Sequence, residues 1–585
     1  MLPGAPWSSK APLWGRFSLG DAAVFAALGL LAFSWMTTEH FLPWVSWHAE
    51  MSAFFAVVLL SWTAWARSLR GTLSVASVPQ VAWPFALIAG LTLIQYATRM
   101  LAYRGDMLVV CFYMAACIAC LTLGFNAPKE LVIESQALRR WSPAEALAMV
   151  FVLGGLASTV VAFAQVLGLW EHTALIARMS EQRRPGGNLG QPNQLATLLV
   201  MAVASTGFLH AAGKVPARVA ALLLVALCAG IAVTESRSGA LGLATVLVWW
   251  QLKRSQVARQ VSAWTAPGAG AIFLAMYIFW PKILASMDLL GGRIESRFGQ
   301  GDIRFAMWSQ LLEAALQRPW WGWGMAGVAK AHNAVADGYV INNPFTYSHN
   351  LAIDLIVWLG FPFAAILLIA SGFWFWRRLR AADRLEPWYC LAVLLPLATH
   401  SMLEFPFAYV YFLAPVLFLV GVLERASGAP ARLRIGSKPV LALLLVFSAG
   451  LAWSATEYLA IEEDFRIVRF EQLRLGNTPT DHHRPDVVMQ TQLGALLTAP
   501  RIPLRPSMPD ADLEEIRQLA LRYPWAATQY RYALALALNG QRQEAVRQLQ
   551  IIRWQRGENF YARLKGDLAE LAQSRFPQLR DFVLP

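Results

Sequence analysis

Long apolar runs alternate with short polar segments from about residue 20 to residue 456. The runs are roughly 16–25 residues long, and a helix needs about 20 apolar residues to cross the hydrocarbon core of a bilayer. Helices can repeat such runs in lipid because each one satisfies its own backbone hydrogen bonds. We therefore predict an all-α, polytopic integral membrane protein with about 13 transmembrane helices. The predicted spans are 20–36, 50–66, 81–97, 106–124, 144–168, 193–212, 217–233, 238–252, 268–282, 350–376, 387–402, 408–423 and 439–456.

Basic residues lie mainly in alternate loops between these runs. A cluster of four arginines at 377–384 belongs to the basic set, whereas the short loops of the other set carry few Lys or Arg residues. Positively charged loops stay in the cytoplasm. We therefore expect the N-terminus inside and, because the number of spans is odd, the C-terminal tail outside. Two long segments then face the outer side, namely the loop at about 283–348 and the tail at 457–585.

The composition agrees with a membrane protein and argues against other classes. Hydrophobic residues make up 57% of the chain and charged residues 15%, against about 25% charged residues in soluble domains. The net charge of +13 comes from basic residues at the ends of apolar runs, so no nucleic-acid partner is expected. The five cysteines lie within apolar runs and form no CxxC pair, so neither a disulfide framework nor a metal site is predicted. The first apolar run has no clear cleavage site after it, so no cleavable signal peptide is expected.

The tail has the pattern of a small helical domain. Its charged residues alternate with Leu and Ala stripes at helical spacing. The segment 531–550 resembles a tetratricopeptide-type helix–turn–helix with Asn539-Gly540 in the turn. One such unit cannot bury its own apolar face, so helices at about 457–475, 511–522 and 557–573 are expected to complete the layer.

Two short polar motifs fall on the expected outer side. The segment 183–194, after the fifth span, combines two arginines with glycines and with several amides, among them Gln191 and Asn193. Asn193 could cap the next helix, but this many polar groups exceed what a cap needs. Between the seventh and eighth spans, Arg237 lies close to hydrocarbon, where an arginine normally pairs with a phosphate or carboxylate. A local pair with Glu235 is the alternative.

The long outer loop adds Arg293, Arg297 and Arg304, followed by Trp308. Arg304 and Trp308 are four residues apart and share one face of a predicted helix. The apolar part of this helix, at 306–316, is expected to lie on the membrane surface. Lipid attraction does not explain the arginines, because the outer face lacks the anionic potential of the cytoplasmic leaflet.

His349 and Asn350 directly precede the tenth span, and Asp354 follows one turn later. A histidine at the N-terminus of a transmembrane helix lies in a positive potential, which keeps an imidazole neutral near pH 7. A neutral imidazole can accept a proton from a hydroxyl nucleophile. His349 is therefore the candidate general base.

The connection between the eleventh and twelfth spans, 400–411, is also polar and aromatic. His400 and Glu404 are four residues apart and are expected to share a helix face, and Tyr409 and Tyr411 follow. A His/Glu pair could ligate a metal, but too few further ligands lie nearby. We expect a hydrogen-bonded structural pair or an orienting pair instead.

Taken together, these segments resemble the bacterial O-antigen ligase/polymerase superfamily and, within it, the PglL-like (pilin-type) protein O-oligosaccharyltransferases. The resemblance covers most of residues 20–456. It rests on EHFLPWVSWHAE (39–50), GNLGQPNQLATLL (187–199), ESRSGAL (235–241), the run from Arg304 through Trp308 to Gly322-Trp323-Gly324, SHNLAIDLIVWLG (348–360) and HSMLEFPFAY (400–409).

The resemblance implies a metal-independent, inverting glycosyltransferase without a cofactor in the bacterial inner membrane. Its donor would be a preassembled oligosaccharide on undecaprenyl diphosphate, transferred en bloc on the periplasmic side to a Ser/Thr hydroxyl of pilin or another periplasmic protein. It also implies a membrane glycosyltransferase domain at 1–456 and a periplasmic helical domain at 457–585.

The family's functional residues map onto several of the residues above. Its histidine matches His349, its arginines match Arg237 and Arg304, and its QPN glutamine matches Gln191. Its tyrosine corresponds to Tyr409 or Tyr411, while its usual histidine after QPN is Gln194 here. The remaining predicted substrate-binding residues are Asn193, Arg297, Asn350, His400 and Glu404.

Other functions share parts of this pattern. An O-antigen ligase would use lipid A core as acceptor, and an O-antigen polymerase would use another lipid-linked glycan. The large outer tail favours a protein acceptor. A transporter of lipid-linked glycan would carry ionisable residues at mid-membrane depth and internal repeats, and neither is evident. A scaffold for periplasmic partners built on the tail is a further alternative.

Overall fold

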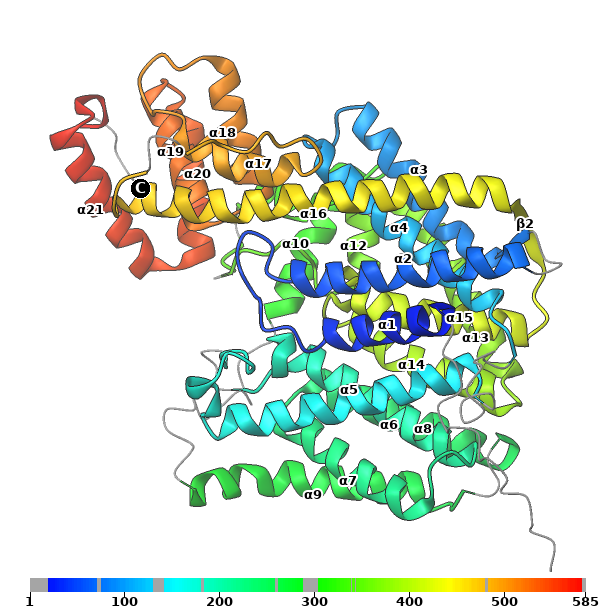
Figure 1. Ribbon diagram of the computed structural model, residues 1–585. Coiled ribbons are helices and arrows are strands. Elements are labelled where there is room, and N and C mark those ends of the chain that lie inside the picture. The colour runs from blue at the N-terminus through cyan, green and yellow to red at the C-terminus, as the bar shows by residue number, and fades with distance from the viewer. Residues whose placement is uncertain are drawn as a thin grey trace, which may run out of the picture.

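The computed structural model describes residues 19–70, 75–129, 141–179, 184–257, 261–287, 303–337, 339–341, 343–478 and 482–580, and these residues are mostly helical (Figure 1). Every segment predicted as a span contains a helix. The helices of the apolar part are α1 (Leu19–Ser34), α2 (Trp47–Arg70), α3 (Trp83–Ala97), α4 (Arg104–Phe125), α5 (Pro143–Val166), α6 (Pro192–Ala211), α7 (Ala217–Val233), α8 (Arg237–Val257), α9 (Thr265–Ser286), α12 (Leu351–Leu359), α13 (Phe361–Ala381), α14 (Leu385–Ser401), α15 (Val410–Ala426) and the first part of α16 (Ser437–Leu473).

Seven helices among the described residues are long and apolar enough to cross a membrane, which agrees with a multi-pass membrane protein. They include α4, α5 and the 37-residue α16. Two shorter apolar helices, at 20–34 and 217–233, add to them. The number of thirteen membrane crossings and the inner and outer sides stay predictions.

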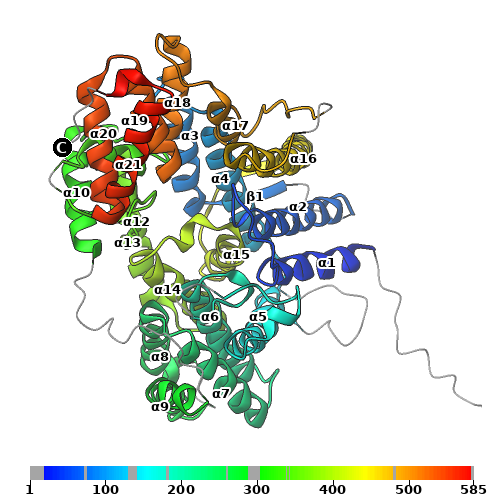
Figure 2. The same ribbon diagram turned by 90° about the vertical axis from the view of Figure 1, so that its left-hand side faces the viewer.

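The helices form two groups that meet at α14 and α15 (Figure 2). One group is α5 to α9, in which α6 is almost completely enclosed by protein. The other group contains α1 to α4 and α16, and α15 packs along α4. Lipid tails are as apolar as leucine, so close contact between such helices depends on small residues at the interface.

Two glycines allow the contact between α4 and α15. A Cβ atom at Gly124 would lie 1.9 Å from the carbonyl oxygen of Phe418, and one at Gly421 would lie 2.2 Å from the carbonyl oxygen of Leu121. The two backbones therefore touch directly. This contact sets how α15 packs along α4.

The predicted tenth span, 350–376, is not one continuous helix. It is divided into α12 and α13 at Gly360, which has a φ of 79°. A Cβ atom there would lie 2.5 Å from the carbonyl carbon of Trp320. The loop at 319–323 packs into the break, where Trp323 N–H donates to the Val357 carbonyl at 2.7 Å and Phe361 N–H donates to the Pro319 carbonyl at 2.8 Å.

The tail contains the predicted helix–turn–helix. Its helices are α17 (Thr491–Thr498), α18 (Asp510–Arg522), α19 (Ala526–Leu538), α20 (Arg542–Arg556) and α21 (Glu558–Ser574). Gly540 has a φ of 79° in the turn between α19 and α20. The expected helix at 457–475 is the second half of α16, so the proposed domain boundary at 456 falls inside one unbroken helix (Figure 1).

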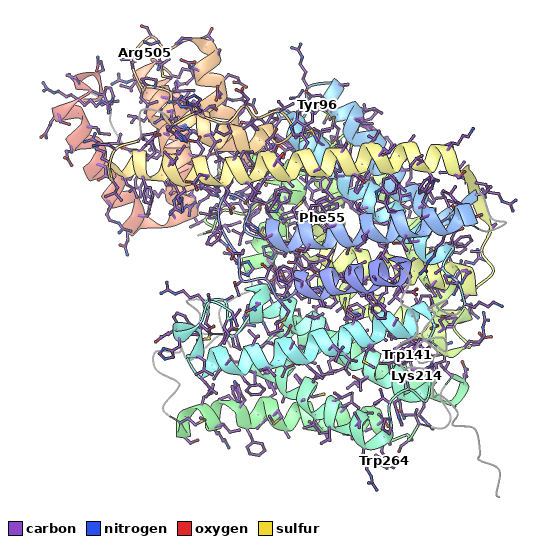
Figure 3. All side chains as sticks on the ribbon, in the orientation of Figure 1. Phe55, Tyr96, Trp141, Lys214, Trp264 and Arg505 are labelled. Carbon is purple, nitrogen blue, oxygen red and sulfur yellow. The ribbon has the colours of Figure 1, made fainter. Side chains whose placement is uncertain are left out.

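Two short strands were not predicted. Strand β1 (Val75–Pro79) pairs antiparallel with β2 (Ala431–Gly436) at the end of α16 away from the tail (Figure 1). Lys214 lies at this same end, with its amine 5.1 Å from the centre of the Trp141 ring (Figure 3). Both strand segments were expected in cytoplasmic loops, and their pairing agrees with the two loops lying on the same side of the membrane.

The α4–α15 contact can be tested with Gly421→Ala. The added methyl group must displace backbone atoms, so we expect a loss of about 1–3 kcal/mol and a lower midpoint of thermal unfolding in detergent. Gly29→Ala is the matched control, because no atom lies within 4 Å of a Cβ atom at that helical position. An equal midpoint for both variants would contradict the close helix contact.

Candidate functional site

A buried carboxylate, Glu404, joins three residues that are far apart in the sequence. Its Oε1 accepts a hydrogen bond from the Arg304 guanidinium at 2.5 Å, and its Oε2 lies 2.5 Å from Nδ1 of His349. The Asn193 side-chain amide donates to Oε1 at 3.4 Å. The predicted residues His349, Arg304, Asn193 and Glu404 therefore form one site.

Glu404 reaches this position because α14 ends before it. The helix stops at Ser401, and the N–H groups of Leu403 and Glu404 both bond back to the His400 carbonyl. Glu404 therefore lies in a turn, and the prediction that it shares a helix face with His400 is wrong. His400 Nδ1 instead lies 2.8 Å from the Thr197 hydroxyl, inside the protein.

His349 has a left-handed backbone conformation, with a φ of 59°. This conformation is uncommon outside glycine and costs free energy, so surrounding contacts must hold it. The neighbouring Ser348 provides them: its N–H donates to Asp354 at 2.8 Å, and its carbonyl accepts from the Trp308 indole at 2.8 Å. Asn350 then caps α12 by accepting from the N–H groups of residues 352 and 353.

The charge of Glu404 follows from its partners. Burial opposes ionisation, but the hydrogen bond from His349 and the positive charge of Arg304 outweigh it and hold the pKa of Glu404 below its ordinary value of 4.5. A carboxylate at Nδ1 orients the imidazole and holds the proton of its neutral form on Nδ1. The other ring nitrogen, Nε2, is then left with a lone pair that can accept a proton.

Asn193 connects this cluster to the start of α8. Its side-chain oxygen accepts from the Ser236 hydroxyl at 2.7 Å and from Arg184 at 3.4 Å. Arg237 follows Ser236 as the first residue of α8, and its side chain is exposed. The described residues contain no ion pair between Glu235 and Arg237. Arg237 therefore keeps its guanidinium exposed at the same helix end as Ser236.

Several other predicted residues make contacts within the protein. Gln191 is the N-cap of α6, since its side chain accepts from the Gln194 N–H at 2.6 Å, and the expected cap Asn193 is not used as one. Tyr411 is buried and donates to the Gln194 side chain at 2.8 Å. Tyr409 stacks on Tyr411 with ring centres 5.1 Å apart. Arg297 lies outside the described residues.

Three contributors were not among the predicted site residues. Ser236 and Arg184 hold Asn193, and Asp354 holds the backbone before His349. Asp354 was noted in the sequence as the acid one turn after His349, but no role was predicted for it. Among the described residues no group of three or more His, Cys, Asp or Glu side chains could hold a metal ion.

Comparison with known proteins gives three family matches. Residues 185–210, which contain Gln191 and Asn193, match a protein glycosylation ligase family. Residues 221–368, which contain Arg304 and His349, match an O-antigen ligase family. Residues 388–567, which contain Glu404, match the C-terminal region of a membrane-bound polymerase described as a virulence factor.

Two curated proteins from Acinetobacter baylyi are similar to the chain. A general O-oligosaccharyltransferase is 24% identical over 545 residues, which cover 89% of this chain and 90% of that protein. A ComP-specific O-oligosaccharyltransferase is 25% identical over 362 residues, which cover 59% of this chain and 62% of that protein. These matches confirm the resemblance seen in the sequence motifs.

The charge of Glu404 makes the stability of this cluster depend on pH. Its folded pKa lies below the ordinary value of 4.5, so the carboxylate stabilises the fold at neutral pH, and this contribution disappears as the pH falls below that ordinary value and through the lowered pKa. Glu404→Gln should therefore cost about 1–2 kcal/mol at pH 7, and the difference from the wild type should shrink on acidification. Thermal unfolding of both proteins across pH measures this. Exposed Glu570→Gln is the control, and a difference that does not change with pH would contradict the ionised cluster.

Proposed function

We propose that this chain, a glycosyltransferase of the PglL-like O-oligosaccharyltransferase type, transfers a preassembled oligosaccharide en bloc from a lipid-linked donor to a hydroxyl group of a protein. The donor is undecaprenyl diphosphate carrying the glycan, and the acceptor is a Ser or Thr of pilin or another periplasmic protein. The reaction takes place at the periplasmic face of the bacterial inner membrane. The observation that carries the proposal is the contact of Arg304 and His349 with one carboxylate.

His349 acts as the general base. Glu404 holds Nδ1–H, and Nε2 removes the proton from the acceptor hydroxyl while its oxygen forms a bond to C1 of the first sugar. The bond between C1 and the diphosphate oxygen breaks on the opposite face, so the configuration at C1 inverts. The electron pair of that bond leaves with the lipid diphosphate, and the proton stays on His349.

Arg304 and Arg237 stabilise the leaving group. Arg304 contacts Glu404 through its Nη2 nitrogen, and the planar, always charged guanidinium matches the geometry of a phosphate. The exposed Arg237 supplies a second cation from the N-terminus of α8, where the helix dipole also favours an anion. The diphosphate carries its own charge, and fixed positive groups lower the barrier as that charge increases. This chemistry needs no metal ion from the protein.

The protein acceptor is supported by the relatives and by the tail. One relative is named a general O-oligosaccharyltransferase and the other a ComP-specific O-oligosaccharyltransferase. The tail packs beside the loop that precedes His349, since the Arg547 side chain donates to the Asn333 carbonyl at 2.7 Å. A folded domain beside the site can position a protein better than it can a membrane lipid.

Replacing the general base tests the mechanism. His349→Ala should lower kcat for glycan transfer by at least about 10²–10⁴-fold, because the acceptor hydroxyl loses the imidazole that takes its proton. Membrane insertion and abundance should not change. His172→Ala is the matched control, since His172 is an exposed histidine in the turn after α5. Normal transfer by the His349→Ala enzyme would reject the assignment.

The acceptor class is tested in a deletion strain. Mass spectrometry of periplasmic proteins and pilin should show loss of the glycan, while a lipopolysaccharide gel stays unchanged. Complementation with the wild-type chain should restore the glycopeptides, and complementation with the His349→Ala chain should not. Loss of the O-antigen ladder with intact glycoproteins would instead assign the chain as an O-antigen ligase.

A further inference from the structure

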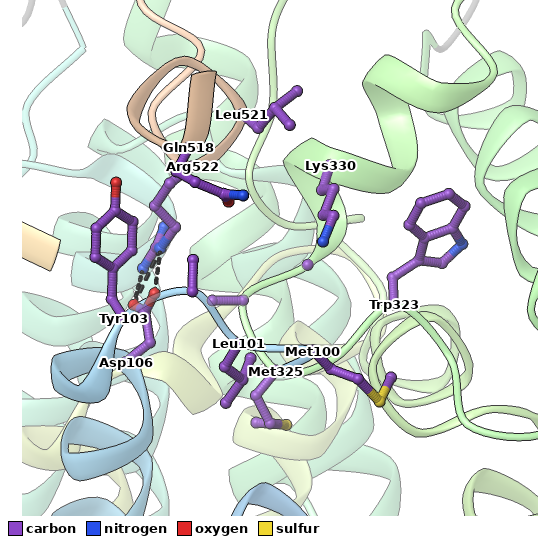
Figure 4. A pocket seen from close by; sticks show the side chains of 13 residues that line it. Met100, Leu101, Tyr103, Asp106, Trp323, Met325, Lys330, Gln518, Leu521 and Arg522 are labelled. Carbon is purple, nitrogen blue, oxygen red and sulfur yellow. Dashed lines mark hydrogen bonds and ion pairs between the residues drawn. The ribbon is translucent and has the colours of Figure 1, made fainter. Parts of the chain in front are cut away.

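A small pocket lies where the tail meets the membrane part of the chain (Figure 4). Its walls come from three places: the turn between α3 and α4, the loop at 323–330 with the start of α11 (Val328–Ala334), and α18 of the tail. Its volume is about 40 Å³. One water needs about 10–15 Å³ of such volume, so the pocket has room for a group of a few heavy atoms.

The unusual feature of this pocket is Lys330. Its side chain is half-buried, and its amine points into the pocket (Figure 4). Among the described residues the structure records no hydrogen bond or ion pair for this amine. Burial and the positive charges of Arg318 and Arg517 lower the pKa of Lys330. A half-buried cation beside like charges is costly unless an anion joins it.

The acidic residues nearby are already engaged. The Asp106 carboxylate accepts hydrogen bonds from two nitrogens of Arg522, from Nη2 at 2.8 Å and from Nε at 3.0 Å (Figure 4). Glu514 accepts from Arg517 at 2.9 Å and also from Gln518. The surroundings of Lys330 therefore carry more positive than negative charge, so an anion would be bound favourably there.

The shape of the pocket limits what that anion can be. Met100, Leu101 and Met325 form an apolar side, and the Gln518 amide lies opposite, near Lys330 (Figure 4). A carboxylate at the end of one or two methylene groups fits a narrow pocket with an apolar wall and a cation inside. The carboxylate of an acidic sugar is attached directly to its ring, and the ring is too large to follow it into this volume.

We propose that this pocket binds the carboxylate of an Asp or Glu side chain of the acceptor polypeptide, with Lys330 as its counter-ion. The inference rests on the proposed function, because it assigns an acceptor contact to the junction between the tail and the catalytic part. The pocket is also connected to the site. Trp323 lines the pocket, and its N–H bonds the carbonyl of Val357, in the helix that begins after His349. A bound acceptor would stabilise the junction between tail, loop and α4.

Small carboxylates provide the test, with the full-length protein in detergent and thermal unfolding as the measurement. N-acetyl-glutamate amide should raise the unfolding midpoint in a saturable way, because a ligand that binds only the folded state stabilises it. N-acetyl-glutamine amide, which has the same shape without the charge, should have no effect. Lys330→Met should weaken the apparent affinity for the glutamate probe about tenfold or more.

The control variant is Lys565→Met, a partly buried lysine of α21 that lines neither this pocket nor the site. It should keep the wild-type response. Gln518→Leu provides a second pocket variant if Lys330→Met does not fold, and it should also weaken binding. Binding is measured without donor or transfer, so a failure here is distinguishable from a failure of the proposed function.

Three outcomes would overturn the proposal. The first is no response of the wild type to the glutamate probe, and the second is an unchanged response in both pocket variants. The third is a Lys330-dependent response to glucuronate that equals or exceeds the response to the glutamate probe, which would assign the pocket to an acidic sugar of the glycan instead.

Discussion

The site depends on one carboxylate, Glu404, shared between an arginine and a histidine. Its two oxygens face different partners, Arg304 Nη2 on one and His349 Nδ1 on the other, both at 2.5 Å. Without the carboxylate, a guanidinium would lie beside an imidazole that must accept a proton, and the positive charge would oppose that role. With the carboxylate between them, a cation for the leaving phosphate and a base for the attacking hydroxyl can lie side by side. The layout resembles a catalytic triad, in which an acid orients a histidine that acts on a hydroxyl.

The fold brings these groups together because several helices begin or end beside the site. Four helices begin beside the site, namely α6, α8, α12 and α15. The break at Gly360 makes α12 a separate short helix, and His349 directly precedes its N-cap. The close α4–α15 contact sets how α15, the helix after the turn with Glu404, packs along α4, while Trp308 and Asp354 hold the strained backbone around His349. The tail contacts the loop before His349 through the hydrogen bond from Arg547 to Asn333, and it contacts α4 through the ion pair of Arg522 with Asp106. Acceptor binding at the junction would therefore act on a part of the molecule that also positions the base.

Hydropathy was enough to locate the helices, because an apolar run of membrane length has few other stable structures. Motif spacing was enough to select His349, Arg304, Asn193 and Glu404. It did not give their contacts: helical spacing paired His400 with Glu404, since nothing local signals that α14 ends at Ser401. The break at Gly360 was missed because it depends on a loop at 319–323 that packs from outside the helix. The strands were missed because each pairs with a partner more than 350 residues away in the sequence. Lys330, which has no ion pair among the described residues, could not be found either, because its surroundings come from three separate segments.

The most direct test of the shared carboxylate is a double-mutant cycle between His349 and Glu404, measured as the rate of a single round of glycan transfer. Glu404→Gln should slow transfer about 10²-fold or more in the wild-type enzyme, because an amide lacks the negative charge that fixes the tautomer of the imidazole and stabilises its protonated form. In an enzyme that already carries His349→Gln, the same change should cost only a few-fold, since the two residues act as a unit. Equal losses in both backgrounds would show that Glu404 and His349 act independently, and the account would be wrong.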